Sequence, residues 1–127
     1  MKKVGIIRCQ QTEDLCPGIK DFKFAAEGKG TFEELGPCEV IGFVSCGGCP
    51  GKRAVHRAKM LKKLGADAVA LASCITLGTP IGFPCPNKAM MLRAIRKALG
   101  EDFTVLDHTH PIPPEQQDSA ACGQKCC

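Results

Sequence analysis

The 127-residue chain has no tryptophan or tyrosine, and its six phenylalanines do not alternate with a basic patch. Proteins that bind single-stranded nucleic acids stack the bases on aromatic side chains beside a basic groove. The formal net charge of +4 is also modest for a protein that binds nucleic acid. We therefore expect no nucleic-acid partner.

The sequence also lacks a long apolar run and an export signal. Its longest apolar stretches are well short of the roughly 18 residues that a membrane-spanning helix needs. The first residues, MKKVGIIRC, contain only a short apolar run and no small-residue cleavage site. They indicate a first strand rather than a signal peptide. We expect a cytoplasmic protein with no membrane partner.

Cysteine, by contrast, is abundant. Ten cysteines in 127 residues is close to the level of small disulfide scaffolds. Those scaffolds are short, secreted and rich in loops, whereas this chain alternates strand patterns with helix patterns. In a reducing compartment, cysteines are more often metal ligands or redox thiols.

Four short apolar runs predict the strands of a sheet. The runs lie at residues 3–8, 39–45, 67–73 and 103–107. None of them alternates apolar with polar residues, which is typical of strands buried on both faces of a parallel sheet. Because strand patterns alternate with helix patterns along the chain, the sequence predicts an α/β domain with a small four-stranded parallel sheet and flanking helices. We expect a flavodoxin-like or Rossmann-like three-layer sandwich with the strand order 2-1-3-4.

Helical patterns separate these runs. One follows Pro50 and stops at Gly65, and another begins at Asn87 and stops at Gly100. A less regular helix is expected after Asp21, which would cap it. The pattern predicts one domain over residues 1–110. Residues 111–127 are rich in proline, glutamine and small residues, and we expect them to form a flexible tail that contains cysteines.

The predicted strands place sulfur at one edge of the sheet. Cys9, Cys46 and Cys74 each follow a predicted strand, and His108 and His110 follow the last one. Ligands of open parallel sheets bind outside the carboxyl ends of the strands. The next loops add three further cysteines: Cys16, Cys49 and Cys85. Any one of these cysteines alone is as well explained as a small buried apolar residue, but their convergence favours a metal site.

The sequence does not decide whether the bound metal is zinc or an iron–sulfur cluster. Zinc takes four ligands in a closed tetrahedral site, and a cluster takes mainly thiolates. The spacings C-x6-C, C-x2-C and C-x10-C match neither a zinc ribbon nor a ferredoxin. Six sulfurs exceed the needs of a single mononuclear site, which leaves room for a cluster or for two metals.

The stretch CGGCPGKR also allows chemistry without a metal. Cys46 and Cys49 form a dithiol before a predicted helix, whose N-terminus lowers the pKa of a nearby thiol. A thiol-based redox enzyme is therefore the second hypothesis, and a metal carrier or sensor that works with a protein partner is the third. A phosphate loop is disfavoured, because Lys52 stands where the cysteine-dependent phosphatases have arginine.

Several motifs together resemble the CGGC-domain family of small prokaryotic proteins. They are IIRCQQTEDLCPG at 6–18, VSCGGCPGKRAV at 44–55, ALASCI at 70–75 and GFPCP at 82–86. The resemblance covers about residues 3–110 and implies a metal-binding domain, with zinc favoured and no established reaction. The metal ligands that it implies are Cys9, Cys16, Cys46, Cys49, Cys74, Cys85 and His110.

Other candidates are weaker. Arg8, Gly47 and Gly48 are candidates for contact with a cofactor, and a surface ion pair is an equally good explanation of Arg8. Cys38 falls outside the family motifs. The three tail cysteines, Cys122, Cys126 and Cys127, have no clear counterpart, and we expect them to have no structural role.

Overall fold

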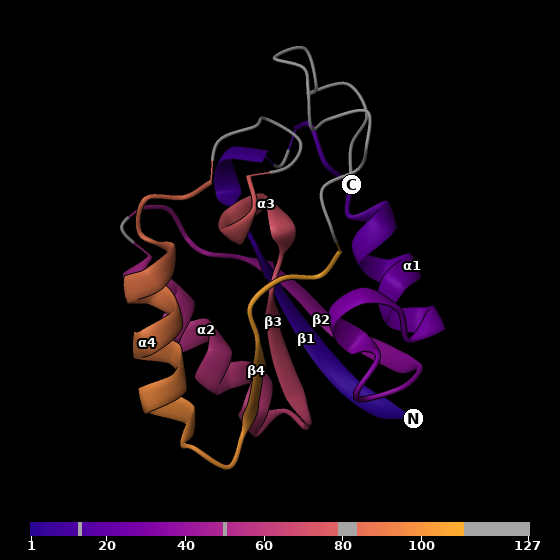
Figure 1. The fold of residues 1–127 in the computed structure, drawn as a ribbon. Helices are drawn as coiled ribbons and strands as arrows, with labels where there is room; N and C mark the ends of the chain where they lie inside the picture. The colour runs from indigo at the N-terminus through magenta and orange to yellow at the C-terminus, as the bar shows by residue number, and fades with distance from the viewer. Residues whose placement is uncertain (13, 50, 79–83, 111–127) are drawn as a thin grey trace.

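The computed structural model describes residues 1–12, 14–49, 51–78 and 84–110. It contains a four-stranded sheet with the order β2-β1-β3-β4, in which every neighbouring pair is parallel (Figure 1). The strands are β1 (Lys2–Arg8), β2 (Cys38–Ser45), β3 (Ala68–Leu71) and β4 (Thr104–Leu106). The predicted parallel sheet and its strand order are confirmed.

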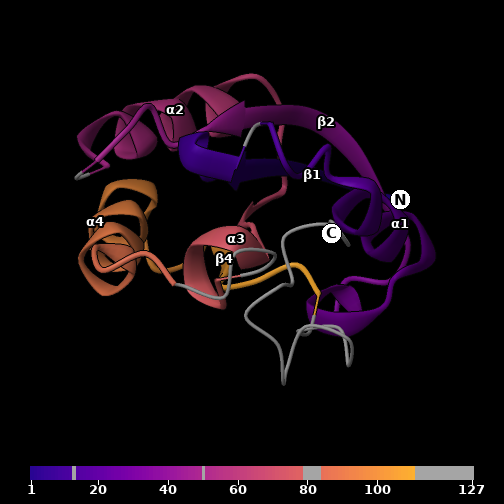
Figure 2. The ribbon, with the colours of Figure 1, turned by 90° about the horizontal axis from the view of Figure 1, so that it is seen from above.

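Helices cover both faces of this sheet. The α-helices are α1 (Ile19–Glu27), α2 (Lys52–Lys63), α3 (Ser73–Thr76) and α4 (Lys88–Leu99), and the 3-10 helices are η1 (Gln10–Thr12) and η2 (Gly30–Phe32). Helices α2 and α4 lie side by side on one face, and α1 lies on the other face beside β2 (Figure 2). In the part of the chain that the structure describes, no helix is both long and apolar enough to cross a membrane.

Burial on both faces explains why apolar and polar residues do not alternate along the strands. β1 is a central strand, and Val4, Ile6 and Ile7 on it are completely buried. All four residues of β3 are buried as well. Because helices cover both faces, side chains that point either way need to be apolar.

The third predicted strand is too long at its carboxyl end. β3 stops at Leu71, and the chain then turns into the short helix α3, which carries Cys74. The N–H of Ala72 still donates to the carbonyl of Ile7 at 2.8 Å. The N–H groups of Ile75 and Thr76, however, donate back to the carbonyl of Ala72. Cys74 therefore lies on a helical turn just beyond the strand.

The start of α1 also differs from the prediction. The helix begins at Ile19, and the residue before it, Gly18, has a φ of 87°. A left-handed conformation of this kind is easily adopted only by glycine. Asp21 is therefore inside the first turn and not a cap, and its side chain is buried.

Helix α2 approaches the sheet closely over two glycines. A Cβ atom at Gly42 would lie 2.5 Å from Leu61 Cδ2, and one at Gly5 would lie 2.6 to 3.0 Å from three side-chain atoms of Leu61. Leu61 is itself only 4% exposed, so it has little room to move away. Because Gly5 on β1 and Gly42 on β2 have no side chain, Leu61 has the space to pack against the sheet.

We expect Gly5→Ala to destabilise the protein by about 1–3 kcal/mol, because the new methyl group overpacks the core against Leu61. The measurement is urea-induced unfolding of the reduced protein. Leu61→Ala provides the control background, since it removes the atoms that clash. In a double-mutant cycle the coupling between the two sites should reach about 1 kcal/mol or more. Simple additivity would show that Leu61 does not occupy this space.

Candidate functional site

Cys9 and Cys46 are neighbours at the carboxyl edge of the sheet. Arg8 and Ser45 are the last paired residues of β1 and β2, and the N–H of Cys46 still donates to the carbonyl of Arg8 at 2.7 Å. The ladder therefore continues by one residue and brings the two cysteines together. Their side chains are joined by a hydrogen bond, in which the Cys9 thiol donates to the sulfur of Cys46.

The CGGC loop wraps around the sulfur of Cys46. Gly47 and Gly48 have φ angles of 82° and 98°, in the left-handed region that favours glycine. In this conformation the N–H groups of Gly48, of Gln10 and of Cys46 itself face the sulfur. Successive N–H groups of this kind form a concave site for an anion.

These donors make Cys46 a thiolate at neutral pH. The hydrogen bond from Cys9 is the largest cause, and together with the backbone N–H groups it outweighs burial and lowers the pKa of Cys46 from 9.0 to about 5. A thiolate is the form of cysteine that binds metals and attacks disulfides. Cys46 is thus the cysteine whose surroundings most clearly favour the reactive thiolate form.

Cys74 completes a row of three sulfurs. The N–H of Cys9 donates to Cys74 Sγ at 3.2 Å, so Cys9 contacts both of the other cysteines. The Thr12 hydroxyl lies beside the same sulfur and donates to the Cys9 carbonyl at 3.0 Å. Burial raises the pKa of Cys74, against these hydrogen bonds, so its thiol keeps its proton. We call Cys9, Cys46 and Cys74 the thiol cluster.

The other cysteines lie around this cluster or away from it. Cys49, on the same loop as Cys46, is exposed, and Cys85 is half-buried before α4, where its sulfur accepts a hydrogen bond from the N–H of Asn87 at 3.4 Å. Cys16 is buried and disulfide-bonded, so it can bind a metal only after reduction. Cys38 begins β2 at the opposite edge of the sheet.

The predicted ligand set stays a prediction as a whole. Among the described residues, no three Cys, His, Asp or Glu side chains are already arranged to hold a metal ion. The tail cysteines Cys122, Cys126 and Cys127 lie outside the residues that the structure describes.

Arg8 holds the loop that follows the first cysteine. Its Nη2 donates to the carbonyls of Thr12 at 2.8 Å and Cys16 at 2.5 Å, and its guanidinium lies 5.4 Å from the centre of the Phe43 ring. The loop from Cys9 to Cys16 is thereby tied to the sheet. This arrangement gives Arg8 a positioning role. Its contact with a cofactor stays a prediction, as does that of Gly47 and Gly48.

A buried polar cluster lies beside the thiols. The Thr109 hydroxyl donates to Asp21 Oδ1, and His110 Nε2 lies 3.6 Å from the same oxygen. Ser73 Oγ donates to the carbonyl of His110 at 2.5 Å. Burial raises the pKa of Asp21, although Thr109, His110 and Arg8 oppose this effect. The predicted ligand His110 therefore faces Asp21 across this cluster.

Thr12, Ser73 and Thr109 are not among the candidates that the sequence suggests, and Asp21 is predicted only as a helix cap. Asp21 is near enough to Cys74 for its charge to raise the pKa of that thiol, so the polar cluster acts on the thiol cluster. The one signal in the sequence is the position of Ser73, directly before Cys74, and of Thr109, between His108 and His110. Such adjacency does not reveal that the two side chains meet.

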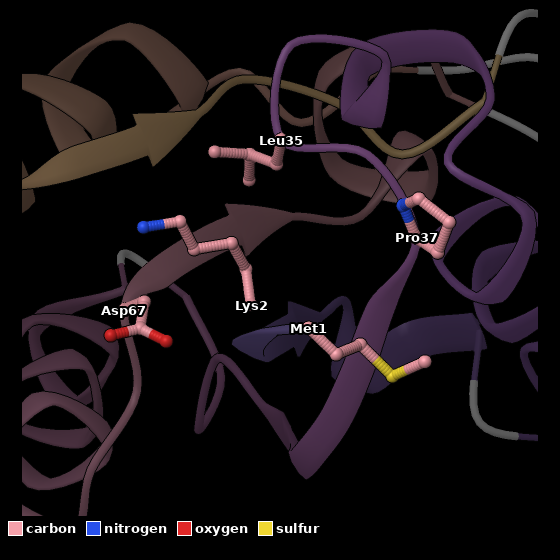
Figure 3. Close-up of a pocket in the computed structure, with 5 residues that line it drawn as sticks. All are labelled: Met1, Lys2, Leu35, Pro37 and Asp67. Carbon is pink, nitrogen blue, oxygen red and sulfur yellow. The ribbon is translucent and has the colours of Figure 1, made fainter.

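A separate hollow lies at the amino edge of the sheet. Figure 3 shows its lining residues, Met1, Lys2, Leu35, Pro37 and Asp67, around a volume of about 590 Å³. Three of its residues, Met1, Lys2 and Asp67, stand at or just before the amino ends of β1 and β3, whereas the thiol cluster follows the carboxyl ends. The described residues that line this hollow contribute no thiol.

Comparison with known proteins gives one family and one relative of undefined function. A family model described as the CGGC domain matches residues 3–110. An uncharacterized protein of Methanocaldococcus jannaschii is 42% identical over 129 residues, which cover 95% of this chain and 96% of that protein. No solved structure matches the chain.

We expect the ultraviolet absorption of the reduced, metal-free protein to show a thiolate that titrates near pH 5, because the pKa of Cys46 is lowered to about 5. Cys46→Ser should remove this step. Cys9→Ala should move it to higher pH, since the largest stabilising hydrogen bond is lost. The folded pKa lies below the ordinary value of 9.0, so this thiolate's contribution to stability falls as the pH drops from about 9 through about 5.

Cys49→Ser is the matched control for this titration, because Cys49 is on the same loop but exposed. It should leave the step unchanged. A step that persists in Cys46→Ser would assign the thiolate to another cysteine.

Proposed function

The chain belongs to the CGGC domain family, and from its thiol cluster we propose that it binds zinc or an iron–sulfur cluster at the carboxyl edge of its sheet. The observation that carries the proposal is the thiolate of Cys46 in hydrogen-bonded contact with a second cysteine, which in turn contacts a third. Soft thiolate ligands suit both zinc and iron–sulfur clusters.

The protonation states of the three thiols support this proposal and predict that metal binding releases protons. Metal ligands need to be deprotonated, and Cys46 already is. Cys9 carries the proton that it donates to Cys46, and burial favours the protonated form of Cys74. Metal binding would therefore release protons from these two thiols at neutral pH.

Cys49 is the best candidate for a fourth ligand. It lies three residues after Cys46 on the same loop, which is a common chelating spacing in zinc sites, and it is exposed and free. His110 is already packed against Asp21, and Cys16 is disulfide-bonded. The proposed ligands are therefore Cys9, Cys46, Cys49 and Cys74.

The first test is the metal and acid-labile sulfide content of protein purified without oxygen. We expect stoichiometric zinc, or iron with sulfide. Loss of an outer-sphere partner costs metal sites about 10–100-fold in affinity, so loss of the ligand in Cys46→Ser should cost at least as much. Cys38→Ser is the control, because Cys38 lies at the opposite edge of the sheet and should keep full metal content. Full metal content in both Cys9→Ser and Cys74→Ser would refute the proposed site.

The contact between Cys9 and Cys46 favours a second function, reversible dithiol chemistry. Adjacent strands lie about 4.8 Å apart, which is within the Cα separation of about 4.4–6.8 Å found in disulfides. The sequence had suggested Cys46 and Cys49 as the redox pair, but the hydrogen-bond partner of Cys46 is Cys9. Cys9 is therefore the better candidate for the second thiol.

The proposed reaction consumes a disulfide substrate. The Cys46 thiolate attacks one sulfur of the substrate, forms a mixed disulfide and releases the other sulfur as a thiolate. Cys9 then loses its proton and attacks Cys46 Sγ, which releases the second thiol. The substrate gains two electrons from the two cysteines, one proton from Cys9 and a second proton from the solvent, and the protein is left with a Cys9–Cys46 disulfide.

We expect metal-free protein treated with glutathione disulfide to form a Cys9–Cys46 link, identified by peptide mapping under non-reducing conditions. Cys9→Ser should instead accumulate glutathione on Cys46, because the resolving thiol is missing. Cys49→Ser should still form the link. A Cys46–Cys49 link in the wild-type protein would contradict this pairing and restore the pair that the sequence suggested.

A further inference from the structure

Positive charge gathers on the two helices that lie side by side on one face of the sheet, α2 and α4 (Figure 2). Ten of the chain's seventeen lysines and arginines belong to these helices, and neither helix contains an aspartate or a glutamate. The rest of the chain is acidic, with seven basic residues against thirteen acidic ones. The modest net charge therefore conceals a strong separation of charge. We call the exposed side of α2 and α4 the basic surface.

The charges of the basic surface are not neutralised within the described part of the chain. No described carboxylate forms an ion pair with a side chain of α2 or α4. Four of the basic side chains donate to backbone carbonyls, which carry no net charge and leave the positive charge in place. These four are Arg57, Lys62, Lys88 and Arg96. The positive potential of the surface thus remains available to a partner.

Both helices carry these charges at positions that weaken them. Three pairs of like charges stand four residues apart, where side chains are neighbours on the helix surface and repel each other. The pairs are Arg53 with Arg57, Lys59 with Lys63, and Arg93 with Lys97. Neither helix has an acidic residue in its first turn, where the helix dipole favours negative charge. A helix face that only needs to be solvated alternates the signs of its charges, so this pattern indicates a binding role.

Exposed apolar side chains accompany the charges. Met60 on α2, Leu64 directly after α2 and Met90 on α4 are 41%, 70% and 47% exposed. Protein interfaces are enriched in methionine and arginine, and the flexible methionine side chain adapts to irregular partner surfaces. The combination of basic and apolar side chains therefore fits a protein whose own surface is acidic.

Other classes of partner fit the basic surface less well. Single-stranded nucleic acids stack their bases on aromatic side chains, and neither helix contains a phenylalanine, tyrosine or tryptophan. A helix that lies on a membrane buries its apolar side in the lipid. The apolar sides of α2 and α4 are already buried within the protein, through residues such as Leu61 and Ile95.

The basic surface begins at the thiol cluster. Helix α2 starts at Lys52, three residues after Cys49. A Cβ atom at Gly47 would lie 2.6 Å from the Cβ atom of Arg53, so Arg53 packs directly against the CGGC loop. A protein bound to the basic surface would therefore lie next to Cys46.

We propose that α2 and α4 dock an acidic protein, which brings its disulfide to Cys46. This inference rests on the dithiol chemistry proposed above and adds the class of partner. Attraction between the unlike charges steers the partner to the surface and raises the rate of encounter. Met60 and Met90 supply apolar contacts once the partner is bound.

The experiment measures how fast the reduced, metal-free, full-length protein reacts with two synthetic peptide disulfides that differ only in having glutamates or lysines around the disulfide. At about 10 mM salt, where charges act over about 30 Å, the acidic peptide should react at least about tenfold faster. At about 1 M salt the two rates should converge, because charges are screened beyond about 3 Å. The uncharged hydroxyethyl disulfide reports the reactivity of Cys46 without steering.

The test variant is Lys59→Gln/Lys63→Gln/Lys97→Gln, which removes three charges of the basic surface beyond the first turn of each helix. It should lose most of the preference for the acidic peptide, and its rate with hydroxyethyl disulfide should not change. Its melting temperature should not fall, because two pairs of like charges are relieved. The matched control is Lys2→Gln/Lys3→Gln/Lys23→Gln, which removes the same charge from exposed residues elsewhere and should keep most of the preference.

Equal rates for the two peptides at low salt, or the same loss in both triple variants, would overturn the proposal. If Cys46 does not react with hydroxyethyl disulfide, the dithiol chemistry itself is refuted and the inference falls with it. Tighter binding to a DNA duplex or to phosphatidylglycerol vesicles than to the acidic peptide, in the same salt, would assign the surface to that partner instead. Self-association of the wild-type protein at low salt that the test variant abolishes would assign the surface to a second copy of the chain.

Discussion

The parallel pairing of β1 with both of its neighbours is the constraint from which the candidate site follows. The N–H groups of Cys46 and Ala72 reach the carbonyls of Arg8 and Ile7 at 2.7 and 2.8 Å, one step beyond the ends of β2 and β3. Buried backbone groups need such partners, so the pairing fixes where the three chains leave the sheet. The convergence of the thiols is thus a consequence of how the core satisfies its backbone, and it does not depend on a bound metal.

The three chains leave the sheet in different ways, and this difference sets the charge of each sulfur. After β2, two glycines in left-handed conformations turn N–H groups toward Cys46. After β3, the chain enters α3, and Cys74 is buried with fewer donors and near the carboxylate of Asp21. One sulfur is therefore anionic while its neighbours hold protons, and the cluster avoids the repulsion that adjacent thiolates would suffer. A metal ion or a disulfide substrate would therefore first react with the Cys46 thiolate, and the two protonated thiols could react after losing their protons.

The sheet and the row of cysteines could be predicted because they depend on local patterns. A short apolar run reports a strand that is buried on both faces, and a cysteine after such a run must lie at the carboxyl edge. The partners of Asp21 could not be predicted in this way, because the hydroxyl that bonds to it lies 88 residues further along the chain. The prediction that the third strand extends to residue 73 was wrong for a similar reason. Ser73 bonds to Thr109 and His110, and these distant contacts favour a helical turn over another strand residue.

Helix α3 joins the thiol cluster to a pocket of about 280 Å³ beside α4. It has only four residues, yet Cys74 on it contacts the thiol cluster and Thr76 on it lines the pocket beside α4. A helix of this length is not stable by itself. It is held by its first residue, Ser73, whose N–H and hydroxyl make buried hydrogen bonds to the segment that follows β4. The orientation of Cys74 and Thr76 therefore depends on the same buried bonds, and a change that loosens Ser73 from Thr109 would displace both side chains together.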